Sequence, residues 1–145
     1  LPLLRAEADA AATALHGANG AVDAIERFVR ALVAFHTGDL TRFRLIYVAA
    51  QVRPRPAMLW PPEALADHVH PETARLYAAL EAALAADPAA RPDLTPRRAA
   101  MTVHMAVLGL VLMVSLGDAL DDPLAHATDD LVETMVALLC RGAVG

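Results

Sequence analysis

Hydrophobic residues recur along this chain at intervals of three and four, which is the spacing of one face of an α-helix. The first such stretch covers residues 3–15, and Gly17 and Gly20 end it. A second amphipathic stretch runs from Val22 to Gly38, a residue suited to the end of a helix. Asp39 can then act as the N-cap of a third helix that reaches residue 50.

Prolines divide the second half of the chain. Four of them lie between Arg53 and Pro71, and because proline lacks an N–H, no long helix is expected to run through this segment. A fourth helix is predicted from Pro71 to about Asp87, and a fifth from Pro96 to Leu116. A sixth is expected to open at Asp122-Pro123 and to end near Arg141-Gly142.

The fifth predicted helix carries no charged residue from position 99 to 116 and is apolar on every side. Such a helix must be covered all round, either by lipid or by protein. Its length is close to the minimum for a membrane span, but His104, Ser115 and the charged neighbouring helices favour a soluble protein. We therefore expect this helix to lie at a subunit interface and not in a membrane.

In that arrangement the fifth and sixth helices pair with the same two helices of a second chain, as a twofold four-helix bundle. The small residue Gly109 would allow the two backbones to approach closely. The predicted dimer interface consists of Val107, Gly109, Val111, Val114, Leu131, Met135 and Leu138.

Composition supports one all-α domain of about six helices over residues 1–145. Hydrophobic residues make up 57% of the chain and aromatic residues only 4%, which favours helices over strands. The net charge is −5 and all twelve basic residues are scattered arginines, so these residues are not expected to bind nucleic acid. Cys140 is the only cysteine, so an intrachain disulfide is impossible and a cytoplasmic location is expected.

Two segments resemble a known family. The segment 35–47, Phe-His-Thr-Gly-Asp-Leu-Thr-Arg-Phe-Arg-Leu-Ile-Tyr, resembles the helix, tight turn and Phe-Arg-Leu segment of the C-terminal domain of TetR-family transcriptional regulators. The segments 101–117 and 129–142 are similar to the two terminal helices through which those regulators dimerise. The resemblance extends over most of the chain as a pattern of helices without an invariant motif.

This resemblance implies a homodimer that senses a small hydrophobic effector inside the helical bundle. DNA would be bound only through an N-terminal helix-turn-helix, which does not precede Leu1 here. The first helix would transmit the signal to it. The expected pocket residues are Phe35, Phe43, Tyr47, Met58, Trp60, Tyr77, Met101, His104, Met105 and Leu108. Two alternatives remain: a helical dimer without a DNA-binding domain that acts as a carrier or interaction module, and a membrane-inserted fragment.

Each candidate side chain also has a purely structural interpretation. Any one of the pocket residues could simply fill the core, and His104 could be a hydrogen-bonded core histidine or a ligand contact. His16 and His36 stand near helix C-termini, where the helix dipole favours an imidazolium. His68-x-His70 lacks a matched third ligand, so no metal site and no cofactor are expected.

No catalytic residue is expected. The only serine, Ser115, and the only cysteine, Cys140, lie in apolar segments with no histidine and acid nearby in the sequence to activate them. The sequence also lacks a glycine-rich phosphate loop. These features predict a binding protein and not an enzyme.

Overall fold

The computed structural model describes residues 2–49, 62–122 and 126–145. Two predicted pocket residues, Met58 and Trp60, lie outside them. The elements are α1 (Pro2–Leu15), α2 (Gly20–Thr37), α3 (Leu40–Phe43), η1 (Arg44–Val48), α5 (Pro62–Ala64), η2 (Leu65–Val69), α6 (His70–Ala86), α7 (Pro96–Leu120) and α8 (Thr128–Ala143). The elements η1 and η2 are single π-helical turns.

The described part of the chain is all-α, as predicted. Because α3 continues into η1, and α5 continues through η2 into α6, these elements form six helical stretches. The prediction of an N-cap at Asp39 is confirmed, since its carboxylate accepts a hydrogen bond from the backbone N–H of Arg42 at 3.0 Å.

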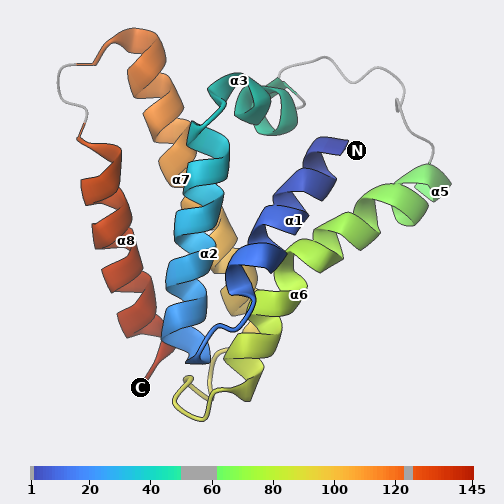
Figure 1. The fold of residues 1–145 in the computed structure, drawn as a ribbon, viewed down its shortest axis with the longest axis vertical. Helices are drawn as coiled ribbons and strands as arrows, with labels where there is room; N and C mark the ends of the chain where they lie inside the picture. The colour runs from blue at the N-terminus through green and yellow to red at the C-terminus, as the bar shows by residue number, and fades with distance from the viewer. Residues whose placement is uncertain (1, 50–61, 123–125) are drawn as a thin grey trace.

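Helix α2 is the centre of the bundle and packs against α1, α6, α7 and α8 (Figure 1). Its apolar residues repeat at helical spacing, so they form one stripe that faces these neighbours. Ile25, Phe28 and Leu32 in this stripe are completely buried. The same stripe ends at the buried His36, so the core that α2 organises includes a polar ring.

The helix that leads into α6 begins earlier than the prolines suggested. Helical structure starts at Pro62, whereas the sequence predicted a start at Pro71. The prolines fit because Pro62 opens the stretch and Pro71 occupies the first turn of α6. The π-helical turn η2 ends at Val69, two residues before Pro71, and a wider turn at this place reduces the crowding between a proline ring and the preceding turn of backbone.

The connection between α7 and α8 also differs from the prediction. Helix α7 continues past Gly117 to Leu120 and ends where Asp121 adopts a left-handed conformation with φ of 50°. Helix α8 begins at Thr128, so the predicted start at Asp122 is wrong. Aspartate tolerates the left-handed region better than most residues, which makes Asp121 a helix terminator that a proline pattern does not reveal.

Helix α7 is buried on one side only. In an 18-residue window its mean hydropathy is 2.1, yet only 39% of that window is buried. By length and composition it is the one helix of the described part that could cross a membrane. The core helix of a soluble protein passes the same test, so this property alone does not indicate a membrane protein.

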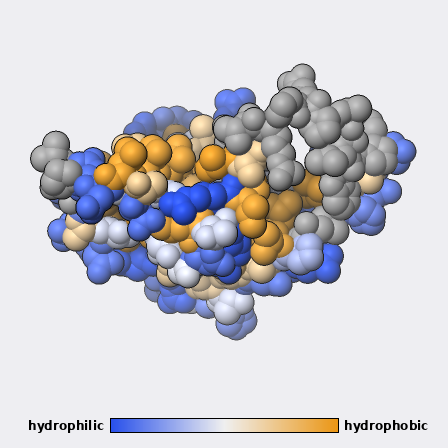
Figure 2. Space-filling model, turned by 90° about the horizontal axis from the view of Figure 1, so that it is seen from above, coloured by the Kyte–Doolittle hydropathy of each residue, from blue (hydrophilic) through white to orange (hydrophobic). Residues whose placement is uncertain are grey.

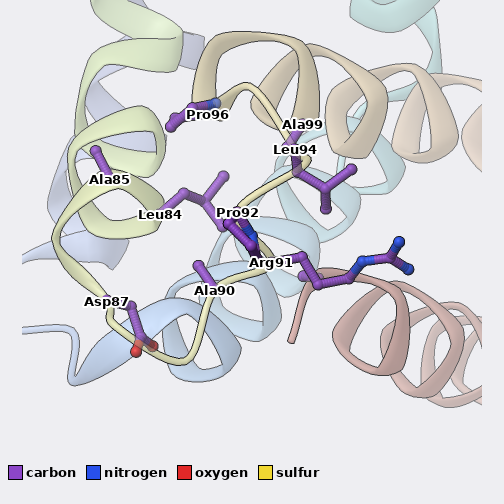
Figure 3. Close-up of a pocket in the computed structure, with 10 residues that line it drawn as sticks. Leu84, Ala85, Asp87, Ala90, Arg91, Pro92, Leu94, Pro96 and Ala99 are labelled. Carbon is purple, nitrogen blue, oxygen red and sulfur yellow. The ribbon is translucent and has the colours of Figure 1, made fainter. Parts of the chain in front are cut away.

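The turn after α6 ties α2 and the C-terminus to the bundle. The Asp87 carboxylate accepts a hydrogen bond of 2.6 Å from the backbone N–H of Ala21, in the first turn of α2. The backbone N–H of Arg91 donates to the carbonyl of Ala143 at 2.9 Å. A small hollow of about 230 Å³ lies beside this turn, and Asp87 points away from it toward the start of α2 (Figure 3).

Candidate functional site

A carboxylate is buried at the centre of the bundle. Glu7 lies on α1 between Leu4 and Ala8, on the same face as Ala11 and Leu15, and its side chain is fully shielded from solvent. An isolated carboxylate in such a place would destabilise the fold by several kcal/mol. The residues around Glu7 therefore have to compensate its charge.

Three other elements supply polar groups to this carboxylate. Nε2 of His36, from α2, lies 3.0 Å from Oε1 of Glu7, and Nε2 of His104, from α7, lies 3.2 Å from the same oxygen. The Tyr47 hydroxyl, from η1, lies 2.7 Å from both carboxylate oxygens. Through Glu7, the helix α1 is therefore connected to α2, η1 and α7.

A fifth residue completes what we call the Glu7 cluster, which consists of Glu7, His36, Tyr47, Tyr77 and His104. The hydroxyl of Tyr77, on α6, lies 2.8 Å from Nδ1 of His104. Aromatic rings surround the cluster: His36 makes edge contacts with Phe43 and Tyr47 at centroid distances of 5.3 and 5.5 Å.

The hydrogen bonds decide the charge of Glu7. Burial raises its pKa, but the hydrogen bonds from His104, His36 and Tyr47 outweigh burial and lower the pKa to about 2. Burial and the nearby Glu7 charge raise the pKa of Tyr47 and of Tyr77 above that of a free phenol. At neutral pH the cluster therefore contains a carboxylate and two protonated phenols.

The proton positions follow from these distances. For both imidazoles to donate to the carboxylate, each must carry its proton on Nε2, and Nδ1 of His104 then accepts from the Tyr77 hydroxyl. Nδ1 of His36 is buried and has no hydrogen-bond partner among the residues that the structure describes. A buried nitrogen of this kind costs about 1–3 kcal/mol.

The same residues also meet the requirements of a metal site. One ligand atom each from Glu7, His36 and His104 lies within 4.8 Å of the others, and all three residues are buried. The pair His68-x-His70 is exposed, on η2 and at the start of α6, and takes no part in this grouping. The grouping of Glu7 with His36 and His104 was missed.

A signal for the missed residues was present in the sequence. Glu7 falls on the apolar stripe of α1, and His36 falls on that of α2, four residues after Leu32. His36 stands in the last turn of α2, as predicted, but its ring is completely buried and contacts Glu7, which the position near a helix end did not indicate. A polar residue within an apolar helical stripe predicts a buried partner, and two such residues can be each other's partner.

The predicted pocket residues divide into two groups. Phe43, Tyr47, Tyr77 and His104 do meet at the Glu7 cluster, while Phe35 lies beside it with Arg42 stacked 3.9 Å over its ring. Leu108 is partly buried against the core.

Met101 and Met105 do not belong to this site. Their side chains are 42% and 65% exposed on the outer side of α7, so the prediction that they line an interior pocket is wrong. The helical spacing of 3.6 residues per turn puts them on the opposite side from Val103 and Val107, which point into the core.

A large apolar groove runs between α7 and α8, with a volume of about 1060 Å³. Met113, Leu120 and Leu138 in this groove are 63%, 73% and 66% exposed. Figure 2, which views the molecule from the end where α7 finishes, shows hydrophobic residues gathered at the surface. The predicted interface residues that line the groove are Gly109, Val114, Leu131, Met135 and Leu138.

Two predicted interface residues face the other way. Val107 and Val111 are completely buried in the core of the single chain, so they offer no surface to a second chain. They lie on the inner side of α7, where they pack with α2 and α6. Because α7 is apolar on every side, its sequence did not distinguish its inner face from its outer face.

Arg44 links η1 to the C-terminal part of α7, beside the groove, by hydrogen bonds. Its guanidinium donates to the Ser115 hydroxyl at 2.9 Å and to the Ser115 carbonyl at 3.1 Å, and reaches the Asp118 carboxylate at 3.3 Å. Ser115 therefore has a structural partner, which explains a buried hydroxyl in an apolar helix.

Comparison of the chain with protein-family models, with curated proteins and with solved structures finds no match.

Proposed function

We propose that this chain is the sensing and dimerising domain of a TetR-type transcriptional regulator. In this proposal two copies associate through the α7–α8 groove, and a small effector changes DNA binding by a helix-turn-helix outside these residues. The observation that carries the proposal is the exposed apolar groove between α7 and α8. The alternative is a helical dimer that acts as a carrier or an interaction module.

The groove has the properties of a surface that is covered by another copy of the chain. Large apolar side chains on both of its walls are exposed, and exposed apolar patches of this kind mark association sites. The acidic residues of the groove, Asp118, Asp121 and Asp122, are confined to one end. A twofold axis through the apolar part would bring α7 and α8 of each chain against the same helices of the other.

Gly109 supports the same arrangement. A side chain added at this position would meet no atom of the described residues within 4 Å, so packing within this part of the chain does not require glycine here. The residue is exposed in the groove wall. A close approach of a second backbone would require it, as at other small-residue helix contacts.

The Glu7 cluster provides a route for a signal from the interior to the first helix. It joins α1, through Glu7, to α7, through His104, and α7 forms one wall of the groove. An effector that enters beside the cluster can shift α1 relative to the dimer axis, provided that it binds one arrangement more tightly than the other. In a full regulator, α1 would pass this shift to the DNA-binding helices.

Native mass spectrometry of the purified chain at low micromolar concentration tests the dimer. We expect a dimer, and a soluble monomer would contradict the proposal. A spin label on Thr13→Cys, an exposed position of α1, in a Cys140→Ser background then reports the distance between the two α1 helices. An effector that changes this distance supports the sensor, whereas a bound molecule that leaves it unchanged supports the carrier.

A further inference from the structure

We infer that Glu7, His36 and His104 form a binding site for a divalent transition-metal ion such as Zn²⁺. The three residues come from α1, α2 and α7, and 97 positions separate the first from the last. Metal binding does not depend on the proposed function, but a role for the ion in signalling does.

The distances suit a small ion. In a tetrahedral zinc site with bonds of about 2.0–2.1 Å, neighbouring ligand atoms stand roughly 3.3 Å apart. Oε1 of Glu7 lies 3.0 Å from Nε2 of His36 and 3.2 Å from Nε2 of His104. The ligand atoms of all three residues lie within 4.8 Å of one another, so binding an ion would mainly draw the two imidazoles closer together.

The donor set selects the class of ion. Two imidazole nitrogens and one carboxylate oxygen are typical ligands of Zn²⁺ and other divalent transition metals. Ca²⁺ and Mg²⁺ instead prefer sites made only of oxygen atoms.

Two hydroxyl groups hold the ligands in place. In the metal-bound form, Nδ1 of His104 carries the proton and donates it to the Tyr77 oxygen, 2.8 Å away. Histidine ligands usually have such a partner on the second ring nitrogen, because it fixes the ring orientation and the tautomer. The Tyr47 hydroxyl, 2.7 Å from both oxygens of Glu7, orients the carboxylate in the same way.

The buried ring of His36 favours a strong bond at Nε2. Its Nδ1 has no hydrogen-bond partner among the described residues, whether Nε2 bonds to Glu7 alone or to an ion. The unpartnered nitrogen therefore costs free energy in either form. A bond from Nε2 to a metal ion offsets this cost better than one hydrogen bond to Glu7 does.

Binding is tested on the wild-type chain. The protein is stripped with a chelator and then titrated with Zn²⁺ or Co²⁺, with the bound metal counted by mass spectrometry after dialysis. We expect one ion per chain and visible absorption bands for Co²⁺ bound to nitrogen. Nitrogen-15 NMR of the imidazoles should show the Nε2 atoms of His36 and His104 bound to Zn²⁺, which identifies the site without any substitution.

Variants test the assignment. His104→Gln and Glu7→Gln should lose the bound ion or weaken its binding at least tenfold, because each removes a ligand. His16→Gln and His70→Gln are the controls, because both histidines are exposed, one directly after α1 and one at the start of α6. These variants should bind the metal ion as tightly as the wild type does. Circular dichroism establishes that each variant is folded.

Two results would overturn the inference: a folded wild-type chain that takes up no stoichiometric ion, or NMR spectra in which Zn²⁺ leaves His36 and His104 unchanged. The spin label on α1 separates this test from that of the proposed function. If the ion binds and the α1–α1 distance changes, the ion is an effector of the proposed sensor. If it binds and the distance does not change, the metal site stands and its signalling role fails.

Discussion

The hydroxyl of Tyr77 and Nδ1 of His104 lie 2.8 Å apart in the buried core, which links α6 to α7. The contact holds the imidazole with Nε2 toward Glu7, on α1. One hydroxyl group on α6 therefore controls how α7 meets α1.

Tyr77→Phe removes only the hydroxyl group. We expect it to lower the free energy of unfolding by about 1–3 kcal/mol, because Nδ1 of His104 is left buried without a partner. Denaturant unfolding measures this loss. Thr102→Val, which removes an exposed hydroxyl bonded to a backbone carbonyl on α7, is the control and should change stability much less. If the chain also binds Zn²⁺, Tyr77→Phe should weaken that binding about 10- to 100-fold.

Stability should decrease in acid because of Glu7. Its pKa is about 2 in the folded chain, below the ordinary value of 4.5, so the unfolded state takes up a proton first as the pH falls. The contribution is complete above about pH 4.5, decreases between pH 4.5 and 2, and amounts to about 3 kcal/mol. Chemical unfolding of the chelator-treated chain at several pH values measures it.

Glu7→Gln should remove this part of the pH dependence, because an amide does not titrate. Glu63→Gln, at an exposed position of α5, is the control and should retain it. An acid profile that is the same in the wild type and in Glu7→Gln would show that another group is responsible.

The groove between α7 and α8 and the buried side of α7 should respond differently to charge. Leu138→Arg and Met113→Arg place an arginine in the exposed groove and should give a folded monomer, because a dimer would bury an unpaired charge. Val107→Arg should prevent folding, since Val107 is completely buried in one chain. Light scattering and circular dichroism measure both properties.

Leu3→Arg, at an exposed apolar position of α1 outside the groove, is the control for the dimer experiment. It should leave the oligomeric state unchanged. A dimer that survives both groove substitutions would place the interface elsewhere on the molecule.

Gly20→Ala should destabilise the chain more than Gly17→Ala. Both glycines have positive φ, 82° and 69°, so a side chain strains the backbone at either position by about 1 kcal/mol. At Gly20, an added Cβ would also lie 2.8 Å from the Asp87 carboxylate oxygen that accepts from Ala21, whereas nothing lies within 4 Å at Gly17. Thermal unfolding of the two variants gives the difference, and equal melting temperatures would argue against the Asp87 contact.

The hydrogen bond between the Asp87 carboxylate and the first turn of α2 should contribute to stability in a pH-dependent way. Hydrogen bonds from the backbone N–H groups of Ala21 and Ala89 lower the pKa of Asp87, so this carboxylate stabilises the fold above its unfolded pKa and loses the effect as the pH falls. Asp87→Asn should reduce the melting temperature at neutral pH and have less effect in acid, where the wild-type carboxylate is protonated.

The sequence alone determined the helical class, the approximate helices and the N-cap at Asp39, because these depend on the spacing of apolar residues and on single local side chains. It also indicated that α7 is unusually apolar. It did not reveal the π-helical turns or the left-handed residue Asp121, because several local conformations fit the same residues there.

Only the tertiary structure decided which polar residues meet. Glu7, His36 and His104 lie far apart along the chain, and each alone is a polar residue on an otherwise apolar stripe. The crossing of α1, α2 and α7 brings their ligand atoms within 4.8 Å. The structure also decided that Val107 faces the core and Met113 faces the groove, because a helix that is apolar on every side, as α7 is, carries no sequence signal for its inner face.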